Sequence, residues 1–81
     1  MRRYFFDMRD GEEVIPDEEG MELSDMDAVQ DEAAYALADM ARDDVRENAT
    51  SGLARHVAIE VRDDYGPVMR AKFSFKIERL Q

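Results

Sequence analysis

The sequence contains no cysteine and no tryptophan, and it has one histidine. Without cysteine there is no disulfide framework, no thiolate metal site and no cysteine nucleophile. Nothing in this composition points to an oxidising compartment, so we expect a cytoplasmic protein. The first apolar run is interrupted by charge at Asp7, which makes it too short for a signal peptide or a membrane span, and we expect no contact with a membrane.

Positive charge is scarce. The chain has 11 Lys and Arg residues against 20 Asp and Glu residues, which gives a net charge of −9. A protein this acidic repels phosphate backbones at long range, so nucleic acid is disfavoured as a partner. The charge is also uneven, because residues 1–50 carry 16 acidic and 5 basic side chains, whereas residues 51–81 carry 4 acidic and 6 basic ones. The basic residues are therefore concentrated toward the C-terminus.

The 81 residues leave room for one domain, spanning residues 1–81. A chain of this size buries only about 60 to 65% of its unfolded surface, so its core is small. Alternating apolar residues predict strands over residues 3–9, 55–62 and 69–78, with a turn at 63–66 between the last two. Short apolar pieces around the turn at residues 16–20 predict one further, irregular strand somewhere between Glu13 and Leu23.

One long helix is predicted between these strands. Ser24 is the expected N-cap, and we expect the helix to end at Asn48, followed by a loop at residues 50–52. Apolar residues at three- and four-residue steps form a core-facing stripe of Met26, Val29, Ala33, Ala36, Leu37 and Met40. The sequence therefore predicts an α+β fold, in which one long helix packs on one face of a four-stranded, mainly antiparallel sheet in the order β-β-α-β-β. The order of strands within the sheet is not predicted.

Two motifs carry a resemblance to a known family. They are Arg3–Gly11, which reads RYFFDMRDG, and Ile15–Leu23, which reads IPDEEGMEL. Both are similar to a family of small uncharacterised proteins found mainly in alphaproteobacteria, domain of unknown function 6894. The resemblance continues through the Asp25–Ala28 helix start and the Val57–Val61 strand, so it covers nearly the whole chain. It implies no activity, no cofactor and no catalytic residue.

The residues themselves give little support to an enzyme. His56 lies outside the apolar set of its strand, where we expect an exposed side chain, and the chain has no glycine-rich phosphate loop. The acidic residues between Asp7 and Glu19 lack the spacing of an EF-hand and indicate a solvated acidic surface instead. We therefore expect a protein that is not an enzyme, with no catalytic residue, no metal and no cofactor.

The uncovered face of the predicted sheet is basic, although Asp7, Glu60 and Glu78 dilute its charge. Its candidate contacts for an anion or another partner are Arg62, Arg70 and Lys72. One alternative function follows, a regulatory protein that binds nucleic acid or another anionic ligand through this face. Because Lys and Arg on an exposed sheet also discourage aggregation, we favour a solubilising role for these residues.

A second side of the helix carries small residues that could let another element approach closely. The candidates for self-association are the small residues Ala34, Ala38, Ala41 and Val45, together with Tyr35, which lies opposite the core stripe. Alanine is also simply the best helix former, and the pattern alone does not separate the two explanations. The main prediction is a small non-catalytic binding or interaction module that forms a homodimer. Two further alternatives stay open. The chain could bind an unidentified protein partner, or its acidic helix could make it an antagonist of a basic protein.

Overall fold

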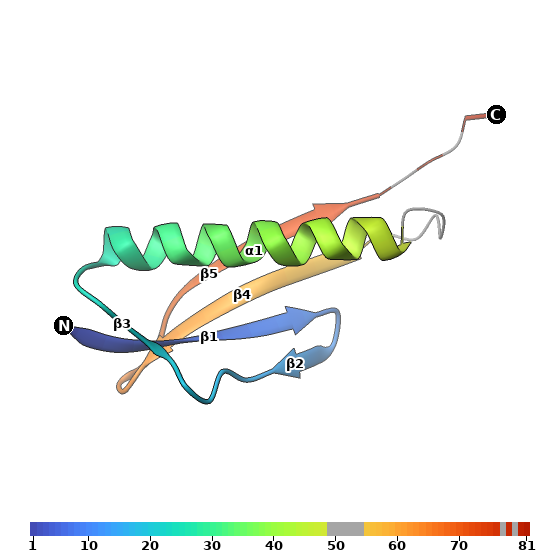
Figure 1. Cartoon of the computed structure of the whole chain (residues 1–81). Helices are drawn as coiled ribbons and strands as arrows, with labels where there is room; N and C mark the ends of the chain where they lie inside the picture. Colours follow the sequence, from blue (N-terminus) through green and yellow to red (C-terminus); the bar gives the residue numbers. More distant parts are fainter. Residues whose placement is uncertain (49–54, 77, 79) are drawn as a thin grey trace.

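A computed structural model describes residues 1–48, 55–76, 78 and 80–81 of the chain. The described part contains one helix and five strands (Figure 1). Their order is β1 (Arg2–Asp10), β2 (Glu13–Ile15), β3 (Met21–Leu23), α1 (Met26–Asn48), β4 (Arg55–Asp63) and β5 (Gly66–Phe75).

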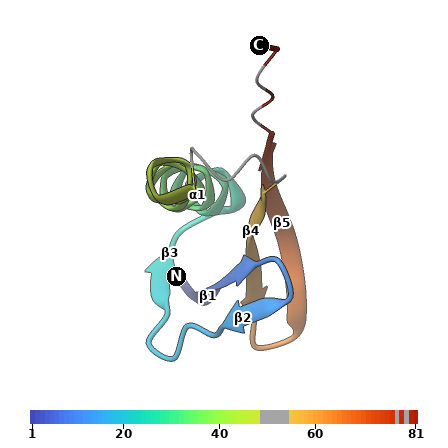
Figure 2. The same cartoon turned by 90° about the vertical axis from the view of Figure 1, so that its right-hand side faces the viewer.

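All strand pairings in the sheet are antiparallel. The strand order is β2-β1-β4-β5, and β3 pairs with the first residues of β1. Helix α1 packs on one face of the sheet and leaves the opposite face uncovered (Figure 2). The predicted α+β fold, with one long helix on an antiparallel sheet, is confirmed.

The predicted second strand is two short strands. β2 pairs with Met8–Asp10, at the end of β1, and β3 pairs with Arg2–Tyr4, at its beginning. Residues 16–20 lie between β2 and β3 and take no part in either strand's pairing with β1. The interruption occurs opposite Phe5–Asp7, where β1 continues to pair with β4 on its other side.

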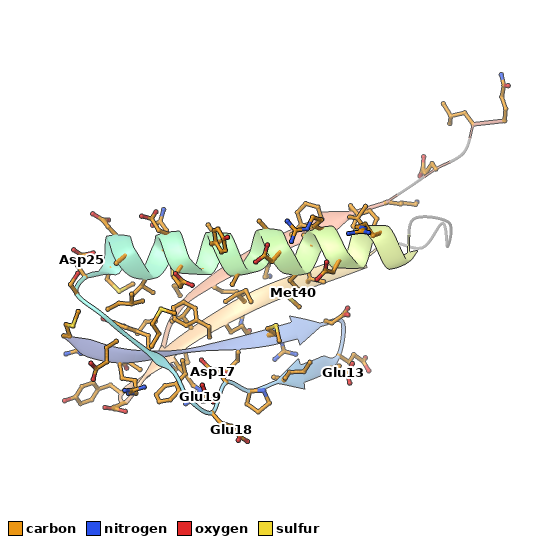
Figure 3. All side chains as sticks on the ribbon, in the orientation of Figure 1. Glu13, Asp17, Glu18, Glu19, Asp25 and Met40 are labelled. Atoms are coloured by element: carbon orange, nitrogen blue, oxygen red, sulfur yellow. The ribbon has the colours of Figure 1, made fainter. Side chains whose placement is uncertain are left out.

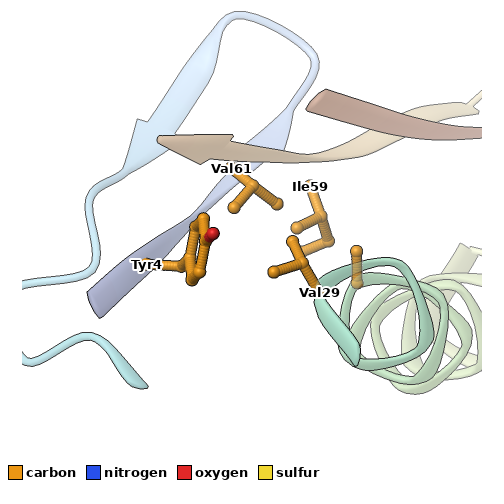
Figure 4. Close-up of a cluster of buried hydrophobic side chains, with 5 residues drawn as sticks. Tyr4, Val29, Ile59 and Val61 are labelled. Carbon is orange, nitrogen blue, oxygen red and sulfur yellow. The ribbon is translucent and has the colours of Figure 1, made fainter. Parts of the chain in front are cut away.

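The core lies between α1 and the sheet. Its buried side chains come from β1, α1 and β4, and Figure 4 shows them converging: Tyr4, Val29, Ala33, Ile59 and Val61. Alternation along β1 and β4 brings these strand residues to one face, because successive strand residues point to opposite sides. The predicted helix stripe is confirmed for Val29, Ala33, Ala36, Leu37 and Met40, whereas Met26, at the helix start, is exposed.

The helix begins one residue later than predicted. Asp25 Oδ1 accepts a hydrogen bond from the N–H of Ala28 at 2.8 Å, and the Asp25 carbonyl accepts the N–H of Val29 at 3.2 Å. This is the geometry of an N-cap, so the cap is Asp25 and the prediction of Ser24 was wrong. The end of α1 at Asn48 agrees with the sequence, whereas the loop expected at residues 50–52 lies outside the described residues.

Asp63 stabilises the turn of the hairpin between β4 and β5. Its carboxylate accepts the N–H of Tyr65 at 2.7 Å and a hydrogen bond from Arg2 at 3.3 Å, which satisfies a side chain that is almost fully buried. A register shift between Val61 and Arg62 precedes this turn in β4. β5 starts directly after the turn at Gly66, earlier than predicted, and ends at Phe75.

Candidate functional site

The loop between β2 and β3 folds a carboxylate back onto β1. Asp17 accepts the N–H of Phe6 at 3.1 Å with Oδ2, and the N–H groups of Glu19 and Gly20 at 3.1 and 3.2 Å with Oδ1. The N–H of Asp17 itself donates to Asp7 Oδ1 at 2.8 Å. The Asp17 side chain thus takes the role of a strand partner along the stretch where β2 and β3 are interrupted.

These contacts shift the pKa of Asp17. Partial burial acts to raise that pKa, because it disfavours the charged carboxylate. The hydrogen bonds from the N–H groups of Phe6, Gly20 and Glu19, together with the charge of Arg62, act in the opposite direction and outweigh burial. The pKa of Asp17 therefore lies below its ordinary value, and the carboxylate is ionised near neutral pH.

Arg62 joins this loop to the middle of the sheet. Its Nε donates to Asp7 Oδ2 at 2.9 Å, and its Nη2 donates to the carbonyl of Asp17 at 3.0 Å. The guanidinium also lies over the ring of Phe5, 4.5 Å from the ring centre. Two acceptors and one aromatic face hold the guanidinium in place, an arrangement that lysine cannot reproduce.

Gly20 completes the loop. Its φ of +72° is in the left-handed region, and a Cβ at this position would lie 2.9 Å from Cε1 of Phe5. Both the backbone conformation and the close approach to the ring therefore require glycine. We call the resulting set the Asp17 clasp; it comprises Phe5, Asp7, Asp17, Gly20 and Arg62.

The predicted anion-contact residues lie on the uncovered face of the sheet. Arg70 pairs with Glu60 at 2.8 Å, and the same carboxylate pairs with Arg9 at 3.2 Å. Together with Asp7 and Arg62 of the Asp17 clasp, these residues line a shallow hollow of about 430 Å³. Lys72 is exposed on the same face, two residues beyond Arg70.

The structure thus brings Arg62, Arg70 and Lys72 together on one face, as predicted. Sequence reasoning placed Asp7 and Glu60 on the same face but missed that they pair directly with the two arginines. Asp7 lies 55 residues before Arg62 in the chain, and Glu60 faces Arg70 only through the β4–β5 register. The face therefore carries interleaved charges of both signs and is not uniformly basic.

The predicted self-association residues are only partly together. An apolar groove of about 570 Å³ runs between α1 and β5. Its apolar lining comprises Ala34, Leu37, Ala38, Ala41, Val45, Ala71 and Phe73, with Arg42 and Arg46 at its rim. Ala41 is buried at the bottom of the groove, and Ala34 and Ala38 are exposed above it. Tyr35, which is 70% exposed, does not line the groove.

The strand beside this groove has an unpaired edge. β5 pairs with β4 on one side, and within the described residues no strand pairs with its other side. Exposed strand edges offer N–H and C=O groups to another chain. The groove and the free strand edge form one continuous surface, which we call the α1–β5 surface.

The described residues form no metal-holding cluster and contain one histidine beside a hydroxyl group. No group of three or more His, Cys, Asp or Glu side chains among them is arranged to hold a metal ion. His56 Nδ1 lies 2.9 Å from Ser74 Oγ, and both side chains are exposed on neighbouring strands. Within the described chain, no helix combines the length and apolar character needed to cross a membrane.

Comparison with known proteins gives one match. The family model described as Domain of unknown function (DUF6894) matches residues 3–74, a span that contains the whole Asp17 clasp and all residues that line the groove between α1 and β5. No match was found among curated proteins or among solved structures. Because the model covers most of the sequence, the chain belongs to the DUF6894 family.

Proposed function

We propose that this chain is a small non-catalytic interaction module of the cytoplasm that forms a homodimer through its α1–β5 surface. The single observation that carries the proposal is the apolar groove beside a strand edge with which no described strand pairs. A second copy would cover both features at once. It would also enlarge a core that, within the described residues, rests on few fully buried side chains.

The charges along α1 favour a two-fold arrangement. The helix positions facing this surface follow alternating steps of four and three residues: Asp27, Asp31, Ala34, Ala38, Ala41 and Val45. Acidic residues stand at the beginning of this row, and Arg42 and Arg46 stand beside its end. A two-fold axis near Ala38 would run two helices antiparallel, so that Asp27 and Asp31 of one helix lie toward Arg42 and Arg46 of the other.

The small side chains favour close contact. Ala34 and Ala38 are exposed, and each leaves room for a neighbouring backbone or side chain to enter the groove. An extended edge strand could also pair with its counterpart through backbone hydrogen bonds. Both contacts are compatible with one symmetric dimer, because isologous contacts place the same patch on each side of the axis.

The basic sheet face is the weaker candidate for the main function. Arg62 and Arg70 already pair with Asp7 and Glu60 at 2.9 and 2.8 Å. An anionic ligand would have to compete with these carboxylates. A solubilising role explains the same residues without a ligand.

Sedimentation equilibrium on two glutamate variants tests the proposal. Ala38→Glu places a charge in the exposed centre of the groove and is expected to weaken dimerisation by about a hundredfold or more. Tyr35→Glu adds the same charge on the neighbouring helix position outside the groove and is expected to leave the dimer unchanged. Equal effects of the two variants, or no effect of Ala38→Glu on a protein that does dimerise, would contradict the assignment of this surface.

A further inference from the structure

A second groove runs along the other side of α1. Two neighbouring hollows of about 440 Å³ each lie between the helix and β2, and both are lined by Met8, Ile15 and Ala36. Because they share these three residues, they form one continuous groove, which we call the α1–β2 groove. It lies on the opposite side of α1 from the α1–β5 surface.

The floor of the α1–β2 groove is apolar and open to solvent. Met8 and Ile15 face each other in the β1–β2 register, so both side chains reach the helix-covered side of the sheet. Met8 is 37% exposed and Ile15 is 51% exposed. Met40 points from α1 toward β1 and β2 and extends the same floor (Figure 3). Apolar side chains grouped in a hollow of this kind are typical of an interaction site.

The rim of the groove is acidic. It carries Asp10, Glu13, Glu18, Glu19, Asp39 and Asp43. Figure 3 shows Glu13 at one end of the groove and Glu18 and Glu19 toward the other. None of the described residues that line it is Lys, Arg or His. Asp39 pairs with Arg42 at 2.9 Å, but Arg42 belongs to the opposite side of the helix, at the rim of the α1–β5 surface.

The charge of the rim decides between the candidate occupants. A second copy of this chain carries a net charge of −9, and its Arg62 and Arg70 side chains are already ion-paired. It therefore does not complement an acidic rim. Nucleic acid would be repelled by the rim. The described residues hold no arrangement of three or more metal-ligating side chains, which leaves no support for a metal. A cationic segment with apolar residues on one face complements both the floor and the rim.

We propose that the α1–β2 groove binds a basic amphipathic segment of another protein, with apolar side chains on Met8, Ile15 and Ala36 and with Lys or Arg side chains against the acidic rim. The proposal goes beyond the homodimer, because it uses the other side of α1 and a different class of partner. Dimer formation through the α1–β5 surface leaves this groove open, so one complex could hold two such segments.

The test uses a synthetic peptide of Leu and Lys, about 14 residues long, patterned so that Leu occupies one face of a helix of roughly four turns. A peptide of the same composition in scrambled order is the control for charge alone. Binding is measured by titration calorimetry, and the site is mapped by amide shifts of the ¹⁵N-labelled protein. We expect shifts at Met8, Ile15 and Met40, and at least about tenfold weaker binding of the scrambled peptide.

Two variants separate the rim from the floor. Glu13→Lys with Asp43→Lys reverses two exposed rim charges and is expected to weaken binding by about tenfold or more. Ile15→Ser removes floor area without changing charge and is expected to weaken binding by about three- to tenfold. The matched control, Asp64→Lys with Glu78→Lys, makes the same change in net charge at exposed positions outside the groove and is expected to stay within about twofold of the unmodified protein.

Three results would overturn the proposal. They are equal binding of the patterned and scrambled peptides, equal loss of binding in the rim and control double variants, and amide shifts confined to residues outside the groove. Ala38→Glu distinguishes this proposal from the homodimer. That variant is expected to weaken the dimer as stated above and to leave peptide binding per chain unchanged, so either conclusion can fail without the other.

Discussion

Arg62 on β4 binds Asp7 on β1 through an Nε–Oδ2 contact of 2.9 Å, and its Nη2 reaches the Asp17 carbonyl of the loop between β2 and β3. One side chain thus connects three segments that are far apart in the sequence. The carboxylate of Asp7 is only 15% exposed, so it depends on this guanidinium for a positive partner. The loop reaches the sheet through the same contact.

Replacing Arg62 with alanine should therefore destabilise the fold. Arg62→Ala leaves the largely buried Asp7 carboxylate without its cation and removes the contact with the Phe5 ring. We expect a loss of about 2–3 kcal/mol in the free energy of unfolding, measured by urea titration. Lys76→Ala removes an exposed ion pair with Glu78 of the same length, 2.9 Å, and should cost less than about 0.5 kcal/mol. Similar losses in the two variants would show that the Arg62 contacts add nothing specific.

The stability contributed by Asp17 should depend on pH. Its pKa in the folded chain lies below the ordinary value of 3.8 for a free carboxyl group, so the folded state holds the charged form more strongly than the unfolded state does. This contribution is fully present above the unfolded pKa and is lost as the pH falls through the folded pKa. Asp17→Asn should cost about 1–2 kcal/mol at neutral pH, and the difference from the unmodified protein should shrink below about pH 4. A difference that stays constant down to about pH 2 would contradict the role of the carboxylate charge.

The two glycines with similar positive φ angles should respond differently to alanine. Gly11 has a φ of +61° and open space around it, whereas Gly20 has a φ of +72° and lies against Phe5. Gly11→Ala should cost about 1 kcal/mol for the backbone conformation alone. Gly20→Ala adds a clash with the ring and should cost about 2–4 kcal/mol, measured by thermal unfolding. Equal costs would mean that the Phe5 ring moves away freely.

The N-cap correction is also open to measurement. Asp25→Ala removes the acceptor for the N–H of Ala28 and should lower the stability by about 1 kcal/mol. Ser24→Ala, one residue earlier, should change it by less than about 0.5 kcal/mol, because this exposed side chain does not cap the helix. If denaturant titrations showed a larger loss of stability for Ser24→Ala than for Asp25→Ala, Ser24 and not Asp25 would be the cap.

Local patterns predicted the main elements well. The helix stripe through Val29, Ala33 and Met40 was predicted correctly, because apolar residues repeated every three or four positions line one side of a helix and that side is buried. The alternation along β4 and β5 was correct for the same kind of reason, a period of two. The choice of Ser24 over Asp25 failed because neighbouring capping residues look alike until the backbone hydrogen bonds are known.

Contacts between residues far apart in the sequence could not be predicted from local patterns. The turn residues Pro16, Asp17 and Gly20 were recognised, but nothing nearby in the sequence shows that Asp17 replaces a strand partner for Phe6. The strand order, and with it the pairing of Arg62 with Asp7, depends on which edges meet in the sheet. Tyr35 was grouped with Ala34 and Ala38 because it lies opposite the core stripe of the helix, but it does not line the groove that they line.

Light scattering behind size-exclusion chromatography, on the unmodified chain over a range of protein and salt concentrations, tests the proposed homodimer most directly. The predicted result is a mass of twice 9.4 kDa that persists from about 50 to about 500 mM salt, because an apolar groove is little affected by charge screening. A mass of 9.4 kDa at every concentration and every salt would contradict self-association through the α1–β5 surface.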